Sequence, residues 1–96
     1  MIIDVVVNMN TESICKLMEE INNDKAVPRN IRTAIQQAKD DLSNEKIEET
    51  IRISSVISIL DDVSSDPNIP MYTRTQIWNI VSMLEVINQE VKKNVK

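Results

Sequence analysis

The chain has 96 residues, a formal net charge of −4, no His, no Gly and a single Cys. Without His it has no imidazole base and no His-ligated zinc or haem, and without Gly it has no P-loop, dinucleotide-binding turn or EF-hand loop. One Cys cannot form an internal disulfide. The length and the 42% content of hydrophobic residues indicate one folded domain with a modest core.

The first ten residues are an apolar segment without helical spacing, and we treat residues 1–10 as an N-terminal arm beside a domain over residues 11–96. The β-branched residues of the arm are Ile2, Ile3, Val5, Val6 and Val7. The arm could extend over the domain or over a second subunit, form a helical turn in the core, or be a disordered start. It lacks the basic region of a signal peptide, and no stretch approaches the ~20 apolar residues that span a bilayer. We therefore expect a cytoplasmic protein without membrane contact.

Four later segments carry apolar residues at helical spacing, which predicts helices near residues 11–23, 28–42, 45–64 and 70–93. Polar turn segments end just before Pro28 and Pro70, and the connection around residues 41–44 is predicted to be short. The predicted fold class is all-α, a four-helix bundle. Its predicted buried residues include Ile35, Ile57, Leu60, Ile77, Ile80 and Leu84.

The sequence also matches itself at an offset of 42 residues. The identities include Asp24 with Asp66 and Arg32 with Arg74. This period is similar to that of HEAT-type repeats, and two such hairpins would close on each other as a bundle. The repeated pairs could line a binding groove. A structural device repeats along with its element, however, so we predict that each Asp and each Arg braces its own turn.

Several stretches resemble uncharacterised protein family 0147 over roughly residues 11–87. They are Val27–Arg32, Ile57–Asp62, Asp66–Pro70 and Thr73–Val81. The family consists of small archaeal proteins. The resemblance implies a four-helix bundle with no assigned activity, and it brings no catalytic residues.

Acidic pairs also repeat, because residues 19–20 match residues 61–62. A divalent cation held by Glu20, Asp24, Asp62 and Asp66 is one interpretation. Adjacent acids point in different directions, so pairing with arginines or simple solvation is favoured, and we predict no metal and no other cofactor. Cys15 is interpreted as a small buried hydrophobic residue.

Tyr72 and Trp78 are the only aromatic residues, and Trp78 is either the edge of the core or an interface anchor. Apolar residues beyond the four core stripes also include Ile59, Val81, Val86 and Val95. A surplus of this kind favours a homodimer through Trp78, Tyr72 or the arm, over a monomer whose arm folds back.

The resulting functional prediction is a non-enzymatic protein-interaction or assembly module with an unknown protein partner. Direct nucleic-acid binding is not expected, because the net charge is negative and the basic residues are dispersed. An accessory role in a ribonucleoprotein assembly is the alternative. An enzyme with a carboxylate metal site is a third interpretation.

Overall fold

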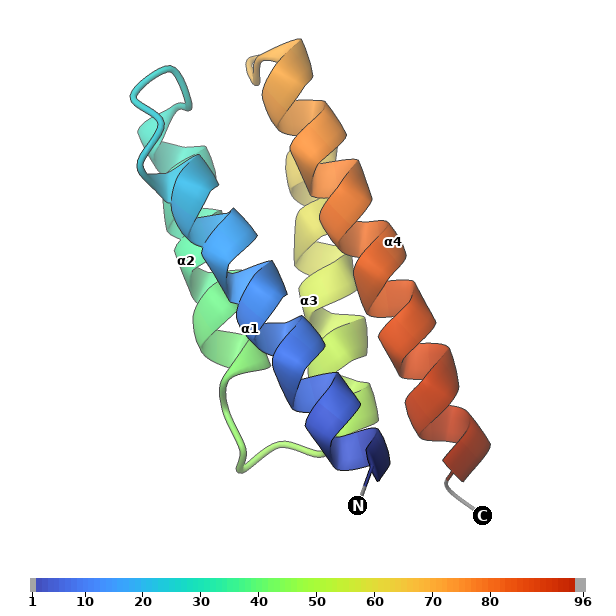
Figure 1. Cartoon of the computed structure of the whole chain (residues 1–96). Coiled ribbons are helices and arrows are strands. Elements are labelled where there is room, and N and C mark those ends of the chain that lie inside the picture. Colours follow the sequence, from blue (N-terminus) through green and yellow to red (C-terminus); the bar gives the residue numbers. More distant parts are fainter. Residues whose placement is uncertain (1, 95–96) are drawn as a thin grey trace.

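The computed structural model confirms the all-α fold class and contains four helices in the part of the chain that it describes. It describes the backbone of residues 2–94 and the side chains of residues 11–91. The helices are α1 (Ile2–Asn22), α2 (Arg29–Leu42), α3 (Glu49–Ser64) and α4 (Met71–Asn94). They run alternately up and down, and each packs against its two neighbours in the bundle. Both termini lie at the same end (Figure 1).

Two boundaries differ from the sequence-based expectation. Helix α1 begins at Ile2, so its backbone includes most of the segment that we treated as an arm. The side chains of residues 1–10, including Ile2, Ile3, Val5, Val6 and Val7, lie outside the described residues. Helix α3 begins at Glu49 rather than near residue 45. The connection between α2 and α3 is therefore not short: residues 43–48 are as many as residues 23–28 or 65–70.

The helices end without glycine because their last turns need no left-handed residue. The C-caps of α2 and α3 are Ser43 and Ser65, with φ, ψ of −88°, −4° and −83°, −9°. Both are right-handed helical values that any residue adopts. No residue in the described part of the chain has a positive φ, which is consistent with a sequence that contains no Gly.

One hydrophobic core runs along the middle of the bundle. Five of the six residues that we predicted to be buried are buried: Ile35, Leu60, Ile77, Ile80 and Leu84. The expectation for Ile57 was wrong, because it is only partly buried at the edge of the core. Its neighbour Val56 points inward instead, and adjacent residues of a helix cannot both face the bundle axis. The core also contains Val27 and Ile69 from the connections, and the buried Thr73 lies beside it.

Candidate functional site

All three connections contain the same local turn. In each, an Asp or Asn follows the helix by two residues, and its Oδ1 accepts a hydrogen bond from the backbone N–H two residues later. The distances are 2.9 Å from Ala26 to Asp24, 3.1 Å from Lys46 to Asn44 and 2.8 Å from Asn68 to Asp66. This is the Asx turn, which fixes a tight chain reversal. The structure therefore gives Asp24 and Asp66 a turn-forming role, and Asn44 takes the same role in the middle connection.

An arginine lies eight residues after the Asp or Asn of each turn, and the hydrogen bonds of Arg74 differ from those of the other two. Arg74 bonds the end of α3 and the turn: its Nε lies 3.0 Å from the carbonyl oxygen of Ser64, and its Nη2 lies 3.1 Å from that of Asp66. Positive side chains at a helix C-terminus satisfy carbonyls that the helix leaves unpaired. The Nε atoms of Arg32 and Arg52 are buried, and neither has a hydrogen-bond partner among the described residues. The 42-residue offset in the sequence predicts that the backbone of residues 14–42 superposes on that of residues 56–84.

The shared turn determines which face of each helix hairpin packs against the core. Connections of the same length and the same hydrogen-bond pattern give helix hairpins of the same handedness. In an up-and-down bundle, one hairpin turns at one end and the next hairpin turns at the other end. When hairpins of the same handedness follow each other in this way, the bundle axis lies in front of one hairpin and behind the next. We therefore expect the hairpin of α2 and α3 to direct outward the face that the two other hairpins direct inward.

The burial of α2, α3 and α4 agrees with this expectation. The comparison uses the residues 7, 11, 14 and 18 positions after the Asp or Asn of each turn. After Asp24 and Asp66 all of them are buried: Ile31, Ile35, Ala38, Leu42, Thr73, Ile77, Ile80 and Leu84. After Asn44 all of them are exposed: Ile51, Ser55, Ser58 and Asp62. A shallow hollow of about 430 Å³ lies on this outward face of α3 and is lined by residues between Thr50 and Ser58.

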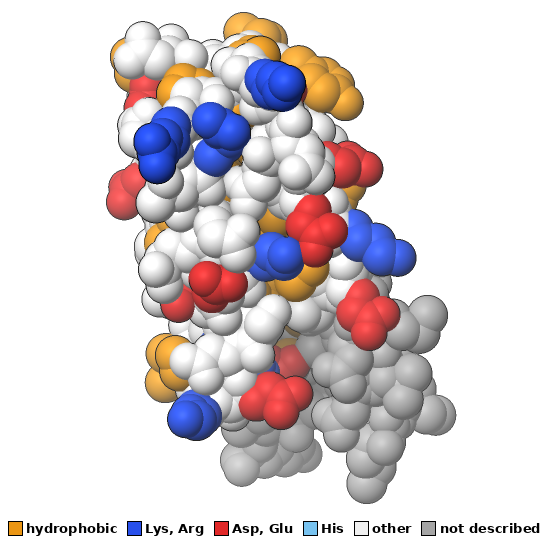
Figure 2. Space-filling model, turned by 90° about the vertical axis from the view of Figure 1, so that its left-hand side faces the viewer, with side chains coloured by type: hydrophobic (Ala, Val, Ile, Leu, Met, Phe, Trp, Pro, Cys, Tyr) orange, Lys and Arg blue, Asp and Glu red, His pale blue; other side chains and the backbone are white. Residues whose placement is uncertain are grey.

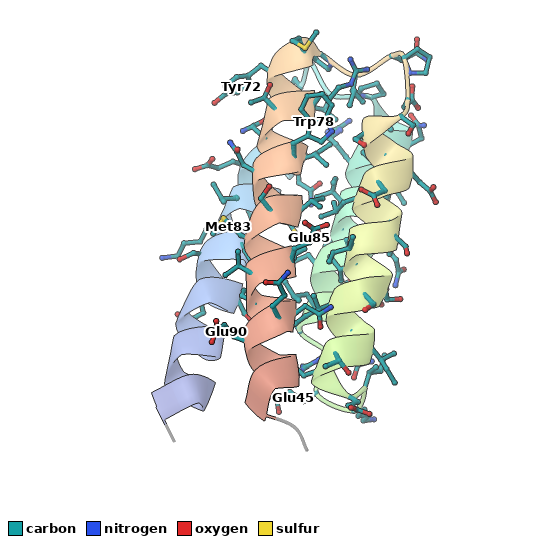
Figure 3. All side chains as sticks on the ribbon, turned by 90° about the vertical axis from the view of Figure 1, so that its right-hand side faces the viewer. Glu45, Tyr72, Trp78, Met83, Glu85 and Glu90 are labelled. Carbon is teal, nitrogen blue, oxygen red and sulfur yellow. The ribbon has the colours of Figure 1, made fainter. Side chains whose placement is uncertain are left out.

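The two aromatic residues lie on different sides of α4. Tyr72 is 69% exposed and Trp78 is 53% exposed. Figure 3 shows Trp78 and Glu85 on the side of α4 next to α3, and Tyr72, Met83 and Glu90 on the side next to α1. Six residues of helix separate the two aromatics by about 120° around the axis. The structure thus does not combine Tyr72 and Trp78 into a single aromatic patch.

Exposed apolar and exposed charged side chains are distributed unequally over the described residues. Among residues 11–91, all the large hydrophobic residues that are exposed belong to α3 or α4: Ile51, Met71, Tyr72, Trp78 and Val86. Within residues 71–91 of α4, Glu85 is the one exposed charged residue. The side of the bundle formed by α1 and α2 carries scattered acidic and basic side chains (Figure 2). The outward face of α4 is therefore the candidate interaction surface.

Sequence reasoning found part of this surface. It placed Trp78 and Val86 outside the core stripe, as the structure does, whereas Ile59 and Val81 are partly buried against the core. Val95 lies outside the described side chains. Met71 was missed, although it lies seven residues before Trp78 and thus on the same side of the helix.

The acidic residues that we considered as metal ligands are not gathered. Glu20 and Asp62 are exposed, while Asp24 and Asp66 each bond their own turn. No group of three His, Cys, Asp or Glu residues that could hold a metal occurs within the described residues. Cys15 is partly buried rather than fully buried, and its Sγ lies 3.9 Å from Oγ of Ser43.

Another hollow, of about 350 Å³, lies where α1 passes the connection between α2 and α3. Glu12, Glu45, Glu49 and Arg52 contribute to its lining. Glu45 lies at this lower end of the bundle in Figure 3.

An ion pair links α1 to α2. Nζ of Lys39 donates a hydrogen bond to Oε1 of Glu19 over 2.7 Å. This hydrogen bond lowers the pKa of Glu19 below its ordinary value of 4.5, and the charge of Lys39 acts in the same direction. The same bond raises the pKa of Lys39 above its ordinary value of 10.5. Because the pair is exposed to solvent, its contribution to stability is small.

The pair predicts a small stability difference that disappears in acid. A carboxylate whose pKa is lowered by folding stabilises the folded state above its unfolded pKa, and this is lost as the pH falls through the folded pKa. The Glu19→Gln variant should melt slightly below the wild type at neutral pH and equal to it well below pH 4.5. Thermal melts at both pH values test this. A gap that persists in acid, or that Glu20→Gln reproduces in full, would argue against the pair.

No helix in the described part of the chain combines the length and the apolar character that crossing a membrane requires.

Comparison with known proteins gives consistent matches. The model of an uncharacterised protein family, UPF0147, matches residues 5–87, so the likeness begins earlier than the residue 11 that we expected. A UPF0147 protein of Methanocaldococcus jannaschii is 49% identical over 74 residues, which cover 77% of this chain and 80% of that protein. A UPF0147 protein of Pyrococcus furiosus is 45% identical over 92 residues, which cover 91% and 99%. The crystal structure of a UPF0147 protein from Thermoplasma acidophilum is similar with a TM-score of 0.78 and 35% identity, over 84% of this chain and 96% of that one.

Proposed function

The chain belongs to the uncharacterised protein family UPF0147, and we propose that it is a non-enzymatic assembly module that pairs with a second copy of itself through α4. The observation that carries this proposal is the outward face of α4, where Met71, Trp78 and Val86 are exposed and Glu85 is the one exposed charged residue among residues 71–91. When a partner covers a face of this composition, few charges lose their hydration and apolar side chains are removed from water.

The composition of the chain supports the non-enzymatic part of the proposal. A chain without His has no side chain whose ordinary pKa lies near neutral pH, which is the property that suits a general acid or base.

Trp78 is the only tryptophan, so its fluorescence reports directly on this face. At 53% exposure, its indole should lose water when a second copy covers it. We expect the wild-type emission maximum to shift to longer wavelength as the protein is diluted from a high to a low micromolar concentration. Val86→Asp should abolish this dependence, because it introduces a charge that the contact would have to bury.

Thr33→Asp is the matched control, since Thr33 is exposed on α2, away from the proposed contact. It should keep the concentration dependence of the wild type, and circular dichroism should show that both variants are folded. An emission maximum that is constant at every wild-type concentration would contradict the proposal. So would an equal loss in the two variants.

A further inference from the structure

A second, uncharged stripe runs along α4, separate from its core stripe. Its members are spaced three and four residues apart and are all exposed: Met71, Thr75, Trp78, Ser82, Val86 and Gln89. Steps of three and four keep residues on one face of a helix, and this spacing is the seam along which helices pair. The stripe is therefore a surface on the outside of the bundle that suits packing against another helix.

Five of the six members are spaced symmetrically about Ser82, while Met71 has no counterpart among the described side chains. Ser82 lies four residues after Trp78 and four residues before Val86, and it lies seven residues from both Thr75 and Gln89. A two-fold axis at Ser82 would place Trp78 level with Val86 of the second copy, and Thr75 level with its Gln89. The large indole of Trp78 then lies level with the smaller side chain of Val86, and the polar side chains of Thr75 and Gln89 lie level with each other. A closed two-fold contact requires this kind of self-complementary surface.

We infer that the second copy binds with its α4 antiparallel to this α4, with the two Ser82 residues facing each other at the two-fold axis. This inference rests on the proposed function and adds its geometry. The small Ser82 lets the helix axes approach closely at the crossing. Parallel pairing would set Trp78 against its own counterpart and bring like ends of two helix dipoles together, which the antiparallel arrangement avoids.

The absence of charge along the stripe limits the electrostatic cost of bringing two copies together. Two copies repel each other overall, because each has a net charge of −4. No member of the stripe is charged, so the seam itself removes no charge from water. One helix from each copy makes an interface at the small end of the known range, and such contacts are weak and transient. We therefore expect a dimer that dissociates in the micromolar range.

Disulfide trapping tests the antiparallel geometry. Two cysteines can bond only when their Cα atoms are about 4.4–6.8 Å apart, so a single engineered Cys links two copies well only near the axis. In a Cys15→Ser background, Ser82→Cys should give a dimer on a non-reducing gel after mild oxidation at micromolar concentration. Thr75→Cys, about 10 Å along the helix from the axis, should give much less. Ser54→Cys, exposed on α3, is the control for random collision.

Each outcome separates the two proposals. Equal cross-linking at Ser82→Cys and Thr75→Cys would indicate parallel helices and overturn the antiparallel pairing. Efficient cross-linking at Ser54→Cys alone would move the contact to α3, which overturns both the inference and the proposed face. If no variant cross-links while light scattering gives a dimer mass, the inference fails and self-association stands. If no variant cross-links and the mass is that of one chain, both fail.

Discussion

Replacing Leu60 with alanine should lower the free energy of unfolding by about 2–5 kcal/mol. Leu60 is completely buried on α3, among the residues that fill the core of the bundle. The substitution removes apolar atoms from the core and leaves a cavity, because close-packed neighbours relax only partly. Urea denaturation followed by circular dichroism measures the change.

Ile51→Ala is the matched control for Leu60→Ala. Ile51 lies on the same helix but is 57% exposed on its outward face. We expect a change within about 0.5 kcal/mol, as is usual for surface substitutions. A loss below about 1 kcal/mol for Leu60→Ala, or a larger loss for Ile51→Ala, would mean that the orientation of α3 is wrong.

Replacing Arg74 with methionine should cost about 1–3 kcal/mol of stability. Arg74 donates two partly buried hydrogen bonds, to the carbonyl oxygens of Ser64 and Asp66. Methionine preserves much of the aliphatic bulk but leaves both carbonyls without this donor. Thermal or urea denaturation gives the difference from the wild type.

Arg32→Met tests whether this cost comes from the two bonds. Arg32 holds the equivalent position after Asp24, but its buried Nε has no hydrogen-bond partner within the described residues. Its replacement should therefore cost clearly less than that of Arg74. An equal or greater cost for Arg32→Met would show that the guanidinium contributes through burial or charge rather than through the helix-end bonds.

Periodicity predicted the fold because each helix keeps one apolar face. The stripe that contains Ile77, Ile80 and Leu84 continues without interruption, and all three residues are buried. Start positions were harder to predict. The apolar spacing of residues 2–7 is not helical, yet α1 begins at Ile2. Helix ends depend on local capping, and the carboxylates from Glu45 onward indicated an earlier start for α3 than the structure has.

The turn between α2 and α3 was not predicted, because its residues differ from those of the other two turns at the positions where those two are identical. Asn44 replaces the Asp of the other two turns, and Glu48 replaces Pro28 and Pro70. The backbone hydrogen bond to the side chain is nevertheless the same, because Asn and Asp both offer an Oδ1 acceptor. Ser55 and Ser58 are exposed at positions that are buried after the other two turns, because the hairpin of α2 and α3 directs its opposite face to the core. A comparison of apolar positions therefore could not reveal this third turn.

The candidate surface could be predicted only in part. Trp78 was recognised as lying beside the core stripe, but its exposed fraction depends on how closely α3 approaches α4, which a helical pattern does not contain. The exposed fraction of Tyr72 depends instead on how closely α1 approaches α4, because the structure separates around α4 the two aromatics that the sequence groups together.

The most direct test of the central claim, that the chain pairs with itself through α4, is its mass in solution by light scattering over a range of concentrations. The chain has a mass of 11.0 kDa. Self-pairing predicts that the mass rises from this value toward twice as much with increasing micromolar concentration, and that Val86→Asp keeps it at the value of one chain. A wild-type mass that stays at 11.0 kDa at every concentration would contradict the claim.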